Sequence, residues 1–386
     1  MDPLDIILHQ ALADLEAGGL KRSLRCVDST QRMRISIGSR EFLNFSSNDY
    51  LGLASHSALV EAMQKAACEW GVGATASRLI CGTSSEHAAL EEELAAAKRT
   101  GAALVFSTGV AAASGTIPAI VGRHDVVILD KLSHACLIDG AQSSQATLRV
   151  YPHNDLGKLE SHLKWAREKH PAARVMIITE SVFSMDGDLA PLKEIVELKE
   201  HYGGILFLDE AHAVGVHGHG AQGLAGKLNL AERVEIQMGT LGKALGVSGG
   251  YIAGSRTLID FLINRARSFV FSTAPSPAVA AACRAALRIV QSQEGKVLRE
   301  RLDQNRNLLA SELRMPDPKS AIFPLILGGE EDALREAARL WDAGFFVPAI
   351  RYPTVPRNTA RLRVTLSAAH DAEQIRKLAE VLLQNS

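Results

Sequence analysis

Short apolar runs between residues 100 and 254 constrain the fold of this chain more than any other feature. The runs cover residues 102–106, 126–129, 175–179 and 205–208, and none of them contains a charged residue. Runs of this length indicate strands that are buried on both faces, and the segments between them are long enough for helices. The alternation predicts an α/β fold with a mainly parallel seven-strand sheet flanked by helices.

Two polar motifs follow strands of this predicted sheet. Asp209 comes directly after the run at 205–208, His212 follows three residues later, and Lys243 lies between two glycines beyond a further predicted strand at 235–239. Taken singly, these residues could be a helix cap, a loop histidine and a solvated lysine. Ligands of open α/β sheets bind at the carboxyl ends of strands, where all three are expected. Together they supply what a pyridoxal-phosphate site needs: a Schiff-base lysine and an acid that keeps the ring nitrogen protonated.

Three motifs resemble those of the α-oxoamine synthases. They are TLGK at 240–243, DEAH at 209–212 and FSMDG at 183–187, and the resemblance extends from about residue 20 to the C-terminus. It implies the fold of a fold-type I PLP-dependent transferase, with a smaller C-terminal α+β domain and pyridoxal 5'-phosphate as cofactor. It also implies the reaction, in which an amino acid condenses with an acyl thioester and loses CO2.

Cofactor contacts are expected from several segments. Thr108, Gly109 and Val110 lie between a strand and an uncharged helix, where backbone N–H groups suit a phosphate. Family members usually carry an aromatic residue at the position of Val110. His134 alone would be interpreted as a core histidine, but the resemblance implies that it stacks on the cofactor ring. The other cofactor residues implied by the resemblance are Ser184, Thr240, and, across a homodimer interface with shared active sites, Ser272 and Thr273.

Substrate contacts are implied near both ends of the chain. The resemblance assigns Asn48 to the carboxylate of the amino acid and Arg22 and Thr354 to the acyl substrate, with Lys21 close enough to Arg22 to compete. Arg361 and Arg363 lie on one face of a predicted strand, because side chains alternate along strands. The family pattern favours Arg363 as the second carboxylate ligand and keeps Arg361 as the alternative.

The implied catalytic residues are Lys243, His134, Asp209 and His212. Lys243 would act as the general base, Asp209 would support the ring nitrogen and His212 would bind the ring hydroxyl. The C-terminal segment at 361–370 resembles family members that join L-alanine to a pimeloyl thioester in biotin biosynthesis. Tyr352, where those members usually have proline, also fits the glycine-using 5-aminolevulinate synthase, and glycine C-acetyltransferase is a third alternative. Delivery of the acyl chain by CoA or by a carrier protein stays open, and a non-catalytic scaffold subunit would be expected to lack the lysine.

Composition excludes several classes. A net charge of −1 gives no basis for a nucleic-acid partner. The five cysteines are scattered, which indicates reduced thiols of a cytoplasmic protein, and the acidic start does not fit a signal peptide. The uncharged segment at 100–122 is long enough to span a bilayer, but its small residues and Pro118 favour a buried strand and helix. No metal site is expected, although His217 and His219 follow His212.

The expected organisation has three parts. Residues 1–50 form an N-terminal arm and substrate-entrance segment, residues 51–276 the large PLP-binding domain, and residues 277–386 the small C-terminal domain. In the small domain, strands are expected at 322–327, 345–350 and 361–365, with a helix at 331–343.

Overall fold

The computed structural model describes residues 2–316 and 318–384, and their contacts divide the chain into two compact units. Unit 1 comprises residues up to 48, residues 185–187 and residues from 302 onward, whereas unit 2 comprises residues 49–184 and 188–301. Helix α12 (Gln293–Glu312) runs from one unit into the other.

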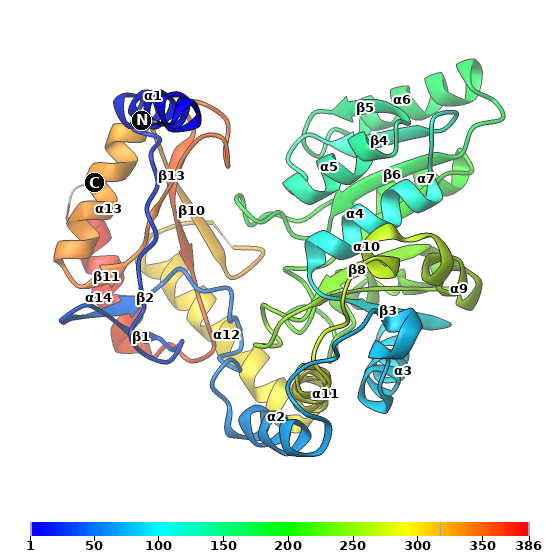
Figure 1. The fold of residues 1–386 in the computed structure, drawn as a ribbon. Helices are drawn as coiled ribbons and strands as arrows, with labels where there is room; N and C mark the ends of the chain where they lie inside the picture. The colour runs from blue at the N-terminus through cyan, green and yellow to red at the C-terminus, as the bar shows by residue number, and fades with distance from the viewer. Residues whose placement is uncertain (1, 317, 385–386) are drawn as a thin grey trace. The chain divides into compact units, whose positions relative to one another are not determined.

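Unit 2 is built on a seven-stranded sheet, as predicted (Figure 1). Its order is β3-β9-β8-β7-β6-β4-β5, and only β9 runs antiparallel to its neighbours. The strands are β3 (Ala102–Phe106), β4 (Val126–Asp130), β5 (Thr147–Tyr151), β6 (Val175–Glu180), β7 (Ile205–Asp209), β8 (Ile236–Thr240) and β9 (Gly250–Gly254). Every residue of β3, β4 and β6 is buried, because helices cover both faces of the sheet.

Helices flank this sheet along the whole of unit 2. They are α2 (Ser57–Trp70), α3 (Ser85–Lys98), α4 (Gly109–Ile120), α5 (Ala135–Ser143), α6 (Leu156–Lys169), α7 (Leu192–His201), α8 (Gly223–Lys227), α9 (Arg256–Arg265), α10 (Arg267–Val270) and α11 (Pro277–Gln291), with short turns at Arg78–Gly82 and Ala231–Arg233. The uncharged segment at 100–122 forms β3 and α4, as expected. Among the described residues, no helix combines the length and the apolar character that crossing a membrane requires.

The core of unit 2 positions the polar ends of its strands. Leu129, Ile178 and Phe207, from β4, β6 and β7, belong to one buried apolar cluster. These strands are parallel neighbours, and Glu180 pairs in register with Asp209. The carboxyl ends of β4, β6, β7 and β8 therefore meet at one edge of the sheet.

Unit 1 contains two three-stranded sheets, with orders β1-β2-β11 and β10-β13-β12. Its elements are α1 (Pro3–Ala17), β1 (Arg34–Ile37), β2 (Arg40–Asn44), β10 (Ile322–Gly328), α13 (Glu330–Asp342), β11 (Phe345–Phe346), β12 (Ala349–Ile350), β13 (Ala360–Thr365) and α14 (Ala372–Leu383). The segment expected as an arm thus contributes β1 and β2, because β2 pairs with β11. The three-part division by role stays a prediction.

The prediction of a single strand at 345–350 is wrong. Residues 345–346 pair with β2 in one sheet, whereas residues 349–350 pair with β13 in the other. Pro348 lies between the two pieces, and proline cannot donate a hydrogen bond to a strand ladder. The chain therefore changes sheets at this residue.

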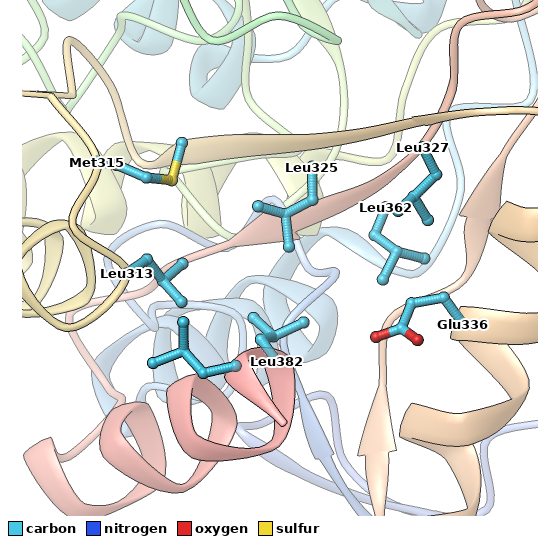
Figure 2. A pocket seen from close by; sticks show the side chains of 8 residues that line it. Leu313, Met315, Leu325, Leu327, Glu336, Leu362 and Leu382 are labelled. Atoms are coloured by element: carbon cyan, nitrogen blue, oxygen red, sulfur yellow. The ribbon is translucent and has the colours of Figure 1, made fainter. Parts of the chain in front are cut away.

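Unit 1 also contains an apolar pocket of about 260 Å³ that is open to solvent (Figure 2). It is lined by Leu313, Met315, Leu325, Leu327, Glu336, Leu362, Leu382 and Leu383. Its one carboxylate, that of Glu336, is bonded to Arg339 on the same helix. The lining is otherwise apolar, and its one carboxylate is paired with an arginine, so this pocket is not a candidate catalytic site.

Candidate active site

Two buried acids mark the edge of the sheet in unit 2. Asp209 is 4% exposed and its Oδ1 accepts a hydrogen bond from the Ala211 N–H at 2.8 Å. Burial raises the pKa of Asp209, and the charge of Lys243 opposes this shift. Burial also raises the pKa of Glu180, and the negative charge of Asp209 adds to that effect. A cation placed near Asp209 would stabilise its ionised form.

Lys243 projects from the turn after β8. Gly246 in this turn has φ +70°, and a Cβ atom there would lie 2.5 Å from the backbone nitrogen of Ala54. The turn therefore needs glycine both for its conformation and for its close packing. Lys243 Nζ lies 2.8 Å from His212 Nε2, and His212 Nδ1 lies 2.5 Å from the Tyr50 hydroxyl. The amine and the imidazole are thus held in one hydrogen-bonded chain.

His134 is the N-cap of α5, which fixes its ring. Its Nδ1 accepts the Cys136 N–H at 3.2 Å, and the backbone N–H of His134 donates to Glu180 Oε1 at 2.6 Å. Burial lowers the pKa of His134, whereas the charge of Asp209 raises it less strongly. The ring is therefore favoured in its neutral form, which suits stacking on an aromatic group.

The N-terminus of α4 opens onto the same place. Thr108 caps this helix, and its Oγ1 accepts the Ala111 N–H at 2.9 Å. A Cβ atom at Gly250 of the adjacent β9 would lie 2.6 Å from the Gly109 nitrogen, so glycine lets the strand approach the helix start. The first backbone N–H groups of a helix carry partial positive charge and suit an anion such as a phosphate.

One cavity of unit 2 joins these groups. It is lined by Thr108, Gly109, Val110, His134, Cys136, Glu180, Asp209, Ala211, His212, Met238, Thr240 and Lys243. An amine, two buried carboxylates, two imidazoles and a helix N-terminus form a set of groups that fits a pyridine bearing an aldehyde and a phosphate. The side chain of Val110 is half exposed, at 53%, and the helix start presents backbone N–H groups whatever this side chain is.

The other predicted cofactor residues do not line this cavity. Ser184 is buried in the turn after β6. Thr273 pairs with Ser77 in an isolated bridge, and Ser272 precedes it on the chain. Their expected contacts, which for Ser272 and Thr273 involve a second subunit, stay predictions.

Unit 1 brings the predicted substrate residues together in two pairs. Arg22 Nη2 lies 3.3 Å from Thr354 Oγ1, and Arg363 Nη1 lies 3.1 Å from Asn48 Oδ1. Arg361, the alternative carboxylate ligand, is instead bonded to Asp186 at 2.7 Å. Arg361 is therefore committed to a structural ion pair.

Three residues of the site region are not among those predicted from the sequence: Glu180, Cys136 and Tyr50. Glu180 could have been found, because it ends an apolar strand in the way that Asp209 does. Tyr50 and Cys136 carry no comparable signal. Within the described part of the chain, no group of three or more His, Cys, Asp or Glu side chains is arranged to hold a metal ion.

Comparisons with known proteins identify the family of this chain. The family model of aminotransferase class I and II matches residues 40–382. The 8-amino-7-oxononanoate synthase of Geobacter sulfurreducens is 48% identical, with 95% of this chain and 94% of that protein covered. The same-named protein of Geobacter metallireducens is 45% identical, with 97% and 96% covered.

Solved structures resemble the whole chain. A serine palmitoyltransferase variant from S. paucimobilis with a bound PLP–myriocin aldimine has a TM-score of 0.92 at 26% identity, covering 99% of this chain and 97% of that one. An 8-amino-7-oxononanoate synthase from Francisella tularensis has a TM-score of 0.75 at 26% identity, covering 88% and 96%. The chain therefore belongs to the aminotransferase class I and II family, as a pyridoxal-phosphate-dependent acyltransferase of the α-oxoamine synthase type that resembles 8-amino-7-oxononanoate synthase.

Proposed function

We propose that the protein condenses L-alanine with a pimeloyl thioester to give 8-amino-7-oxononanoate, CO2 and the free thiol, in biotin biosynthesis. The observation that carries the proposal is the cavity in which Lys243, Asp209 and His134 meet at one sheet edge. The 48% sequence identity to a protein named 8-amino-7-oxononanoate synthase supports this choice of substrates.

Pyridoxal phosphate, when bound, supplies an electron sink for the electron pair released from the α-carbon of the amino acid. Lys243 would hold the cofactor until the incoming amino acid displaces it, and its freed Nζ would then accept the α-proton, with the neighbouring His212 keeping the amine oriented. Asp209 would hold a proton on the ring nitrogen by its charge. His134 would cover one face of the ring, and the N–H groups of Gly109 and Val110 would bind the phosphate.

Unit 1 would supply substrate recognition. Arg363 and Asn48, which are hydrogen-bonded to each other, would bind the carboxylate of alanine, since a guanidinium matches a carboxylate in charge and shape. Arg22 and Thr354 form the second bonded pair and would contact the acyl substrate. Residues 1–50 would thus serve the substrate entrance and residues 51–276 the cofactor.

The active enzyme would be a cytoplasmic homodimer. Ser184 would bind the cofactor from within the subunit, and Ser272 and Thr273 would reach the phosphate of the neighbouring subunit. This arrangement predicts that an isolated subunit has an incomplete site. A second candidate uses glycine in place of alanine, because Tyr352 stands in a Tyr-Pro-Thr-Val-Pro sequence that also resembles 5-aminolevulinate synthase.

The deciding experiment measures free-thiol release by the PLP-loaded protein with pimeloyl-CoA and either L-alanine or glycine. We expect release that depends on L-alanine, and none from a Lys243→Ala variant. Release only with glycine and succinyl-CoA or acetyl-CoA would replace the proposed substrates. Full activity of the Lys243→Ala variant would contradict the role of this lysine.

A further inference from the structure

His153 lies between two carboxylates from different segments, one at the end of β4 and one in the hairpin after β6. It follows β5, and its ring packs edge-on against Phe183 at 4.3 Å. Its Nδ1 lies 3.0 Å from Asp130 Oδ1, and its Nε2 lies 2.8 Å from Asp188 Oδ2. A neutral imidazole has one N–H, so donation to both carboxylates needs the imidazolium. The amide nitrogen of Asn154 also lies 3.2 Å from Nε2. Burial lowers the pKa of His153, but the hydrogen bonds and charges of Asp130 and Asp188 together raise it to about 10.

Asp130 fixes the turn that presents His134. It is the last residue of β4, and its side chain is fully buried. Besides His153, its carboxylate accepts the Leu132 N–H at 2.8 Å and the Asn154 N–H at 2.9 Å. The residues after Leu132 lead directly into His134, the N-cap of α5. A change at Asp130 would therefore move the ring of His134.

Asp188 fixes the hairpin that carries Ser184. The Phe183 N–H donates to the Asp188 carbonyl at 3.0 Å, and Val182 pairs with Leu189, which closes the hairpin. Asn154 Nδ2 donates to Asp188 Oδ2 at 2.9 Å, beside the bond from His153. The segment after β5 is thus bonded to both loops.

We propose that His153 is a positioning residue: its imidazolium ties the turn before His134 to the hairpin of Ser184 and so sets the geometry of the cofactor pocket. The charged groups that face the ring are Asp130, from the end of β4, and Asp188, from the hairpin, and its other neighbours Asn154 and Phe183 are neutral. The inference rests on the proposed contacts of His134 and Ser184 with the cofactor. It is independent of which amino acid and which thioester react.

The protonation state of His153 is tested directly by NMR. Holoenzyme labelled with ¹⁵N in its histidines is measured at pH 7, and the signals of His153 are assigned as those lost in a His153→Gln variant. We expect both ring nitrogens of His153 to carry protons. A neutral ring at this pH would overturn the proposal.

The positioning role is tested through cofactor binding. For His153→Gln we expect PLP to bind about tenfold more weakly, the loss typical of a hydrogen bond to a charged group. The near-UV circular dichroism of the bound cofactor should change as well. His153→Lys, which keeps a cation, should recover part of both signals.

Two further variants complete the design. Asp188→Asn removes one of the two charged partners and should give a smaller loss of PLP affinity in the same direction, which keeps the test valid if His153→Gln does not fold. The control is His162→Gln, because His162 lies on α6 and its Nε2 is 3.4 Å from the Val150 carbonyl, away from the two carboxylates that bind His153. Unchanged PLP affinity and dichroism in both His153→Gln and Asp188→Asn would overturn the proposal. If the wild-type protein binds PLP but releases no thiol with L-alanine and pimeloyl-CoA, the result counts against the proposed substrates and leaves this inference standing.

Discussion

At the scale of single residues, the structure gives different partners to two arginines of which the family pattern favours Arg363 and strand periodicity favours neither. Arg361 and Arg363 both lie on β13 and both are buried. Arg361 is bonded to Asp186 and to the carbonyls of Met185 and Thr359, whereas Arg363 is bonded to Asn48 and Thr365. Strand periodicity places both side chains on one face, and only the partners from distant segments distinguish them.

This difference predicts that substitution of Arg363 affects substrate binding, whereas substitution of Arg361 affects stability. Arg363→Lys should raise KM for L-alanine about 10- to 100-fold, because lysine cannot reproduce a two-pronged bond to a carboxylate. Arg361→Lys should chiefly lower the melting temperature, since it weakens the buried pair with Asp186. Steady-state kinetics and thermal unfolding of both variants check this. A larger KM effect from Arg361→Lys would reverse the assignment.

Two buried tyrosines provide a second residue-scale test. The Tyr50 hydroxyl is bonded to His212, whereas the Tyr251 hydroxyl has no hydrogen-bond partner among the described residues. Tyr50→Phe should therefore lower the free energy of unfolding by about 1 kcal/mol, and Tyr251→Phe should leave it unchanged or raise it. Urea unfolding of the cofactor-free protein measures both. Equal losses in the two variants would show that the bond to His212 is not what stabilises Tyr50.

At the scale of elements, the strands of unit 2 were predictable and their neighbours were less so. Apolar runs such as 126–129 identify a buried strand without knowledge of its partners, and the acid or lysine that follows locates the site. The pairing of β2 with β11 and the break at Pro348 depend on segments about 300 residues apart, which no local pattern reveals. The position of Glu180 at the end of its strand is visible in the sequence, but its bond to the backbone N–H of His134 is not.

A buried ion pair connects α3 to the turn after β7. Lys98 Nζ bonds to Glu210, and neither side chain is exposed (0% each). Glu210 also accepts the Ala225 N–H at 2.9 Å and lies between Asp209 and Ala211. The pair therefore holds the chain immediately next to the acid proposed to face the cofactor.

Lys98→Met should destabilise the protein by about 3–5 kcal/mol, because it leaves Glu210 buried and charged without its partner. The matched control is Lys65→Met, since Lys65 pairs with Glu69 at 3.9 Å on the exposed face of α2 and such pairs contribute little. Chemical denaturation compares the two. A Lys98→Met protein as stable as the control would mean that Glu210 takes up a proton at no cost.

At the scale of the whole molecule, several displaced pKa values act together on stability. His87 and His370 are buried, and burial lowers the pKa of each to about 4. The stability that these two histidines contribute to the folded chain is fully present above the ordinary histidine pKa, and it is lost as the pH falls toward 4. Above about pH 6.5 both rings are neutral in the folded and unfolded chain, so they add no further dependence on pH.

Glu180 and His153 affect how the stability of the folded chain depends on pH above neutrality. Burial and the charge of Asp209 raise the pKa of Glu180 to about 8, and the two aspartates raise that of His153 to about 10. Because the folded chain holds these protons more tightly than the unfolded chain, each contribution is lost as the pH rises through the folded value. The melting temperature of the cofactor-free protein should therefore fall between pH 6.5 and 10. Glu180→Gln should reduce the slope only below about pH 8, whereas His153→Gln should reduce it over the whole range from about pH 6.5 to 10. A melting temperature that rises over this range would show that neither proton is held in the folded state.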